Sequence, residues 1–297
     1  MRGKHVSIYG AVVANLLIAI TKFVAAAVTG SGAMLSEGIH SVVDTGDGLL
    51  VLLGLRLSKR PPTERHPYGH GLEVYFWSMV VAMAIFAVGG GVSVYEGIHR
   101  LGAGADLGSS WWTYAVLGAA FAFEGTSWAI AMREFRRKRG RRGLWQAIER
   151  SKDPTAFIIV LEDSAALVGI IIAAVGITAA HLFQAPILDA LASIAIGLLL
   201  GTVAVILGRE TWSLLIGEAA APEVVQSIRE IASREPGVVG VEVPRTLHLG
   251  PEQIHVDLDV RVEPSGSVDD LLETTRRIEA AVREEHPAVK RVALRFT

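Results

Sequence analysis

Apolar residues gather in six long stretches within the first three quarters of the chain. A helix that crosses a bilayer needs about 20 consecutive, mostly apolar residues, and each stretch reaches that length. In chain order, the stretches are Ser7–Thr29, Ala33–Leu57, Val74–His99, Trp111–Met132, Pro154–Ala180 and Ile187–Leu207. The pattern therefore predicts an α-helical membrane protein whose six transmembrane helices lie within residues 1–216.

After Trp212 the hydrophobic pattern becomes shorter and partly alternating. Helical periodicity and strand-like alternation follow one another, with a Gly-Pro turn between two of the predicted strands. The predicted elements are a helix over Pro222–Arg234, strands over Val238–Leu249 and Gln253–Glu263, a helix over Ser267–Glu285 and a strand over Val289–Phe296. This αββαβ order predicts a small, two-layer α+β domain over residues 217–297.

Basic residues mark one side of the predicted membrane domain. They precede the first helix and fill the links between helices two and three and between helices four and five, with the strongest run over Arg133–Lys152. The alternate links contain only one Lys or Arg, which is Arg100. Because positively charged loops stay in the cytosol, we expect a multi-pass protein of the cell inner membrane with both termini and the C-terminal domain in the cytosol.

The amino-acid composition limits the kinds of metal site and partner that the chain can have. Hydrophobic residues make up 51% of the chain and the mean hydropathy is +0.42, which a soluble domain rarely reaches. The chain has no Cys, so a metal site must use His or oxygen ligands. Residues 217–297 hold 10 Lys or Arg and 15 Asp or Glu. The only sizeable soluble part is therefore acidic, and nucleic acid is not an expected partner.

Ionisable residues inside the second predicted helix share one face. Glu37, His40, Asp44 and Asp47 follow one another at spacings of three, four and three residues, which keeps them on one side of a helix. His40 and Asp44 are four residues apart, so their side chains can converge on one ion. Charged groups in a membrane are costly and are functional candidates by default.

The fifth predicted helix adds two carboxylates, Glu162 and Asp163, with no basic residue of its own to neutralise them. Lys22 in the first helix can pair with one acid but not with all. Acids on two helices would repel each other at similar depth, and a bound divalent cation removes that cost. We therefore expect a cation site; purely structural polar contacts are the alternative. Glu37 and Asp47 either line an access path or bind the ion.

One long motif carries a family resemblance. The stretch SGAMLSEGIHSVVDTGDGLLVLLGLRLSKRPPTERHPYGHG, residues 31–71, resembles the cation diffusion facilitator family of divalent metal transporters. The likeness extends over nearly the whole chain. It implies a homodimer in the lipid bilayer that exports or sequesters divalent metal ions, mostly zinc, in exchange for protons.

The resemblance also implies a transport site built from two residues of helix two and two of helix five. His40 and Asp44 match the first pair, and Asp163 matches the Asp of a His-x-x-x-Asp motif, but Ile159 stands where that His is usual. The segment LEDSAALVG resembles instead the branch that includes human zinc transporter nine. Glu162 is then the expected substitute ligand, although it projects about 100° away from Asp163 around the helix.

The family resemblance favours zinc as the transported ion. The ligand set, which is rich in carboxylates, moves the preference toward manganese or iron(II). Asp47 is a further candidate ligand. In the loop before helix three, His66 and His70 match a second metal site of some family members, and Glu64 is the candidate that would complete it; a purely structural turn is the equal alternative. The family often ends its last strand with a metal-binding His-x-Asp, which is absent here. We expect His248, His255 and Asp257 to be strand surface residues.

Three functional classes compete on this evidence. The leading one is a secondary transporter that exports a divalent metal cation from the cytosol in exchange for protons, with no cofactor beyond the transported ion. The alternative is a non-transporting membrane protein that binds or senses metal. An enzyme is not expected, because the chain shows no His-Glu-x-x-His, nucleophile elbow or phosphate-binding loop.

Overall fold

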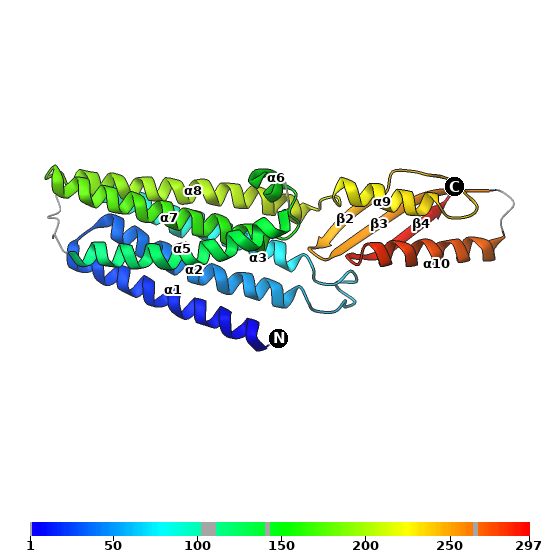
Figure 1. Ribbon diagram of the computed structural model, residues 1–297, viewed down its shortest axis with the longest axis horizontal. Coiled ribbons are helices and arrows are strands. Elements are labelled where there is room, and N and C mark those ends of the chain that lie inside the picture. Colours follow the sequence, from blue (N-terminus) through cyan, green and yellow to red (C-terminus); the bar gives the residue numbers. More distant parts are fainter. Residues whose placement is uncertain (1, 102–110, 140–142, 264–266) are drawn as a thin grey trace. The chain divides into compact units, whose positions relative to one another are not determined.

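The structure is a computed structural model that describes residues 2–101, 111–139, 143–263 and 267–297 (Figure 1). It divides into two compact units. The helical unit comprises Met1–Gly54, Trp77–Glu149 and Pro154–Thr211; the sheet unit comprises Leu55–Phe76, Arg150–Asp153 and Trp212–Thr297. The loop that holds His66 and His70 therefore belongs to the same unit as the C-terminal strands.

Long helices form the helical unit and run alongside one another in Figure 1. A π-helical segment, η1, joins α3 to α4, so residues 73–101 are helical without a break. The helices are α1 (Arg2–Thr29), α2 (Gly32–Leu57), α3 (Glu73–Ala84), η1 (Ile85–Val92), α4 (Ser93–Leu101), α5 (Trp111–Arg139), α6 (Leu144–Glu149), α7 (Pro154–Leu182) and α8 (Ile187–Ile216). The short α6 lies inside the basic link, which the sequence pattern did not predict as helical. The expected link over residues 102–110 lies outside the described residues.

The described part of the chain has five helical spans that are long and apolar enough to cross a membrane, and the Leu16–Thr29 segment of α1 is also apolar. Large apolar side chains such as Leu17, Ile171 and Val205 are more than 45% exposed. Such a surface is unusual for a protein in water but suits helices that face lipid. The transmembrane fold class predicted from the sequence is confirmed.

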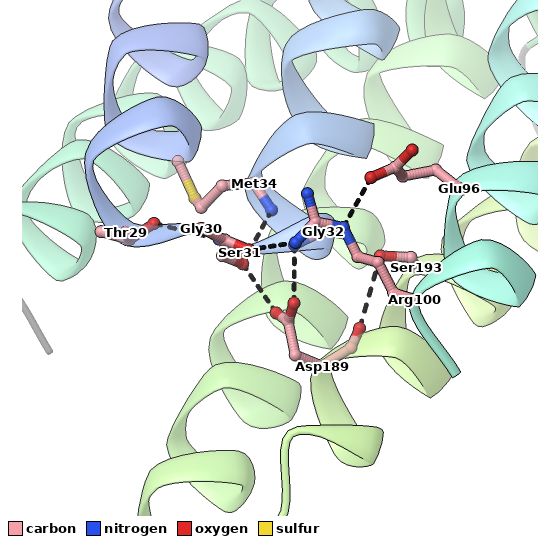
Figure 2. A network of polar contacts seen from close by, with 9 residues as sticks. All are labelled: Thr29, Gly30, Ser31, Gly32, Met34, Glu96, Arg100, Asp189 and Ser193. Atoms are coloured by element: carbon pink, nitrogen blue, oxygen red, sulfur yellow. Dashed lines mark hydrogen bonds and ion pairs between the residues drawn. The ribbon is translucent and has the colours of Figure 1, made fainter. Parts of the chain in front are cut away.

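Asp189, in the first turn of α8, closes the end of the bundle where α1 turns into α2 (Figure 2). Its carboxylate accepts hydrogen bonds of 2.6 Å from the Gly32 backbone N–H and of 2.6 Å from the Ser31 hydroxyl. The Ser31 Oγ in turn accepts a 3.2 Å bond from the Met34 N–H, as a helix N-cap does. Asp189 and Ser31 therefore each satisfy one backbone donor that the first turn of α2 would otherwise leave unpaired.

Arg100, in the last turn of α4, joins the same group of contacts (Figure 2). Its Nε lies 2.6 Å from the Glu96 carboxylate, and its guanidinium also donates to the Gly30 carbonyl. The Ser193 hydroxyl donates a 3.3 Å hydrogen bond back to the Asp189 carbonyl. One end of the bundle is thus held by polar contacts from α2, α4 and α8.

We expect Ser31→Ala to lower the stability of the helical unit by about 1 kcal/mol, because it removes an N-cap and one hydrogen-bond donor to Asp189. The measurement is the midpoint of thermal unfolding of the purified full chain in detergent. Thr126→Ala is the matched control, since the exposed Thr126 hydroxyl bonds only to the carbonyl four residues earlier in its own helix. Equal midpoints for the two variants would contradict this role.

The C-terminal part of the sheet unit consists of two helices and one mixed four-stranded sheet. Its elements are α9 (Pro222–Ser233), β1 (Val238–Val241), β2 (Arg245–Gly250), β3 (Gln253–Val262), α10 (Val268–Glu285) and β4 (Val289–Phe296). β1 and β2 both pair antiparallel with β3, and β4 pairs parallel with it. Apolar side chains of both helices and of β1, β3 and β4 form or line its core.

The sequence pattern predicted a single strand over Val238–Leu249, and this prediction is wrong. The segment forms two strands, β1 and β2, which lie one after the other along β3. The interruption contains Pro244, which has no backbone N–H to donate to a neighbouring strand. The domain is therefore αβββαβ in order, within the predicted α+β class.

His248 is buried, contrary to its prediction as a strand surface residue. His248 is only 4% exposed, and its Nδ1 lies 3.2 Å from the Gly250 carbonyl oxygen. Burial lowers the pKa of His248 below its ordinary value of 6.5, and the Gly250 carbonyl offsets only part of that effect. His255, by contrast, is partly exposed and Asp257 is half-exposed.

A lowered pKa makes the sheet unit sensitive to acid. Above pH 6.5 His248 is neutral in both the folded and the unfolded chain, so its contribution is fully present. As the pH falls below 6.5, the unfolded chain takes up a proton that the folded chain resists, and stability is lost. We expect hydrogen exchange in β2 to accelerate between pH 7.5 and 5.5, after correction for intrinsic rates. His248→Gln should flatten this dependence; an unchanged dependence would contradict it.

Candidate metal site

His40 and Asp44 lie side by side on the inward face of α2. The His40 Nδ1 and an Asp44 carboxylate oxygen are 3.2 Å apart, and the two side chains are 2% and 12% exposed. The two atoms are close but are not aligned as a hydrogen bond, and both nitrogens of His40 lack a hydrogen-bond partner. An imidazole and a carboxylate that are buried, adjacent and unsatisfied are suited to bind a cation.

Lys22 of α1 forms an ion pair with one of the acidic residues of α2. Its Nζ lies 3.1 Å from Glu37 Oε2 and donates a 2.8 Å hydrogen bond to the Ser41 hydroxyl. Both Lys22 and Glu37 are completely buried. The sequence left open whether Glu37 binds the ion or lines a path to it; in the structure it is engaged in an ion pair.

Glu162 and Asp163 face different neighbours across α7. Asp163 accepts a 2.9 Å hydrogen bond from the Ser127 hydroxyl of α5. Glu162 Oε1 is buried without a hydrogen-bond partner, and the Glu162 carboxylate interacts electrostatically with Asp44 on α2. The 100° separation expected between adjacent helical positions therefore directs one acid toward α2 and the other toward α5.

Ile159 shares the Asp163 side of α7, because the two residues are four apart. It is 43% exposed and lines a cavity of about 310 Å³ together with Ser127. A His at position 159 would lie beside α5 rather than toward the α2 acids. Glu162 is the α7 side chain that interacts with Asp44.

Asp47 and Glu124 complete the buried acids around this centre. Asp47 is 1% exposed with an unpartnered Oδ2, and Glu124 of α5 is 4% exposed. Both interact electrostatically with Asp44. The sequence identified Asp47 as a candidate ligand and assigned no role to Glu124. It gave no signal for Ser127, since an isolated Ser in an apolar helix is common.

The described residues contain no group of three or more His, Asp or Glu side chains already arranged around a single ion position. The arrangement brings His40 and Asp44 together, places Glu162 within electrostatic range of Asp44, and leaves Asp163 bonded to Ser127. Binding an ion with all four residues would require the α7 side chains to move. The donors themselves, one imidazole and several carboxylates, fit a divalent cation.

The second candidate site lies in the sheet unit. The rings of His66 and His70 are 4.6 Å apart between centroids, and His70 Nδ1 is buried without a hydrogen-bond partner. Glu64 is exposed and forms no described three-residue group with them. The structure therefore pairs the two predicted His side chains without adding the predicted carboxylate.

Comparison with known proteins identifies the family. The model of the cation efflux transmembrane domain matches residues 8–216, and the model of the cation efflux protein cytoplasmic domain matches residues 220–294. The chain belongs to the cation efflux family, also called the cation diffusion facilitators. This membership confirms the resemblance and identifies a multi-pass membrane protein. The buried ionisable residues of α1, α2, α5 and α7 all lie within the matched transmembrane domain.

Among relatives in the cation efflux family, the proton-coupled zinc antiporter SLC30A9, mitochondrial, of Mus musculus is 33% identical over 268 residues, 88% of this chain and 47% of that protein. Metal tolerance protein C4 of Arabidopsis thaliana is 29% identical over 90% of this chain and 59% of that protein. Magnetosome protein MamB of Paramagnetospirillum magneticum is 23% identical over 97% and 92%. The chain spans about half the length of the SLC30A9 relatives that it matches.

Proposed function

We propose that this chain is a secondary transporter that exports a divalent metal cation from the cytosol in exchange for protons. The observation that carries the proposal is the buried, unsatisfied pair of His40 and Asp44, with the unpartnered Glu162 carboxylate nearby on α7. Carboxylates that lie in a membrane without a counter-charge need a cation. A site that opens alternately to the two sides of the membrane can carry across the ion that it binds. Zinc is the first candidate, because the SLC30A9 relatives are named proton-coupled zinc antiporters.

The ligand set proposed for the ion is His40, Asp44, Glu162 and Asp163, with Asp47 as a further candidate. Manganese and iron(II) are the alternatives to zinc, because one nitrogen among several oxygens forms a harder site than two imidazoles would. The loop residues His66, His70 and Glu64 are proposed as a second cytosolic site.

Proton exchange follows from the ligand chemistry. Metal binds to neutral imidazole and to ionised carboxylate, so protons and metal compete for the same groups. His40 is the proposed main proton carrier, because its buried ring nitrogens make no hydrogen bond and its imidazole can take up a proton when the metal leaves. An inward proton gradient can then drive the metal outward.

The proposed setting is the cell inner membrane, with both termini in the cytosol. Residues 1–216 form the proposed transmembrane domain and residues 217–297 the cytosolic domain, a division supported by the ranges of the two family models. The proposed partners are metal ions, protons, lipid and a second copy of the chain, since two-fold homodimers are the commonest soluble assembly. Under this orientation, the end of the bundle closed by Asp189 faces away from the cytosol.

The deciding experiment reconstitutes the full chain into liposomes with an imposed pH gradient. We expect zinc to accumulate against its own gradient when protons flow the other way, and a pH-sensitive dye to report that flow. The same assay with manganese, iron(II), cadmium and cobalt ranks the cargo. Zinc binding without flux would indicate the non-transporting metal-binding or sensing protein instead. Zinc flux that does not depend on the pH gradient would contradict the proposed exchange with protons.

A further inference from the structure

Lys22 is not one of the ligands proposed for the transported ion, yet it is fully buried. Its ammonium contacts the Glu37 carboxylate and the Ser41 hydroxyl, both on α2. A lysine inside a membrane domain is costly and needs a reason. The pairing explains how Lys22 is tolerated, but not why the pair is located beside a cation site.

Acidic residues of α2 face α7 at two levels. Asp44 interacts electrostatically with Glu162 at one level. Seven residues away on each helix, Glu37 lies against Gly169, where an added Cβ would overlap Glu37 Oε1. Seven residues correspond to about 10 Å along a helix, and nearly return to the same face. The Glu37 level is therefore a neighbour of the metal level on the same face of both helices.

The buried Glu37 carboxylate is suited to bind a metal ion, but it is already paired with Lys22. Its Oε1 is buried without a hydrogen-bond partner, while its Oε2 is held by Lys22. Glu37 is also only three residues from His40, so both lie on the same side of α2. Without the Lys22 ammonium, a buried carboxylate would remain one helical turn from the site with no counter-charge.

We propose that Lys22 is a specificity-determining residue that acts as a resident cation, holding Glu37 out of the ligand set of the transported ion. This inference rests on the proposed function, because it concerns the metal preference of the same site. Lys22 acts through Glu37 and is therefore a positioning residue. With Glu37 engaged, the ion meets His40 and fewer oxygens, which favours zinc; with Glu37 released, an additional carboxylate oxygen favours a harder ion such as manganese.

The test measures competitive binding of zinc and manganese to the purified full chain. Lys22→Met removes the ammonium while keeping an unbranched side chain. We expect it to raise the affinity for manganese relative to zinc on the order of tenfold, the size of effect that a changed ligand environment produces. Lys22→Met combined with Glu37→Gln should return the ratio to the wild-type value, because the released carboxylate is absent.

Two further variants keep the proposal testable if Lys22→Met does not fold. Glu37→Gln alone should weaken the binding of both metals, since it leaves Lys22 unpaired, but it should not change their ratio. A shift of the ratio toward zinc would show that Glu37 is already a ligand and would overturn the proposal. Ser41→Ala, which removes one hydrogen bond of Lys22 but keeps the ion pair, should leave the ratio unchanged.

The remaining outcomes are equally decisive. A Lys22→Met ratio equal to that of wild type, or a shift that Glu37→Gln does not reverse, would overturn the role of Lys22. Zinc flux by the wild-type chain in liposomes is measured separately. A chain that binds metal without transporting it would refute the proposed transport, while the binding ratios would still decide whether Lys22 controls the metal preference.

Discussion

Replacing Asp44 with alanine should abolish metal transport while leaving the fold intact. Asp44 is the acid that connects the two halves of the proposed site, because it lies 3.2 Å from His40 on its own helix and interacts electrostatically with Glu162 on α7. Its Oδ1 makes no hydrogen bond in the structure. No other residue is therefore expected to lose a hydrogen bond to that atom, and the loss should be functional.

The measurement is zinc flux in liposomes together with zinc binding in detergent, and we expect both to fall by more than about a hundredfold, since a lost ligand should cost at least as much as a lost outer partner. Val43→Ala is the matched control, because Val43 is the preceding residue of α2 and carries no ligand atom. A melting midpoint close to that of wild type would show that Asp44→Ala is folded. Normal transport by a folded Asp44→Ala variant would exclude Asp44 as a ligand.

The sequence predicted the membrane helices well because the bilayer imposes a simple rule on them. A run of about 20 apolar residues is visible without knowing any partner. The break between β1 and β2 coincides with Pro244, whereas the alternation of apolar residues on either side of it predicted one continuous strand.

The partners of the buried polar side chains could not be derived from the sequence in the same way. Lys22 could pair with any of several acids, and only the packing of α1 against α2 selects Glu37. The hydrogen bond from Ser127 to Asp163 depends on which side of α7 faces α5. The burial of His248 depends on what covers β2. These facts involve the rotation and contact of whole elements, which the pattern along one chain does not contain.

The last expectation concerns which acid of α7 contributes more to the site. The family motif matches Asp163, whereas the structure turns Asp163 toward Ser127 and leaves Glu162 as the acid that interacts with Asp44. Glu162 Oε1 is buried and has no hydrogen-bond partner to give up. Asp163 must first leave the Ser127 hydroxyl, and breaking a hydrogen bond to a charged group costs about 1.5–3 kcal/mol.

We therefore expect Glu162→Gln to weaken zinc binding by more than about a hundredfold, and Asp163→Asn to weaken it less, on the order of tenfold. The two substitutions form a matched pair, since each replaces one carboxylate by its amide on adjacent positions of one helix. Ser127→Ala is the diagnostic third variant. If Asp163 joins the ion only after leaving Ser127, Ser127→Ala should strengthen zinc binding. If Asp163→Asn proves the more damaging substitution while Ser127→Ala has no effect, the Ser127 contact does not persist when the ion binds.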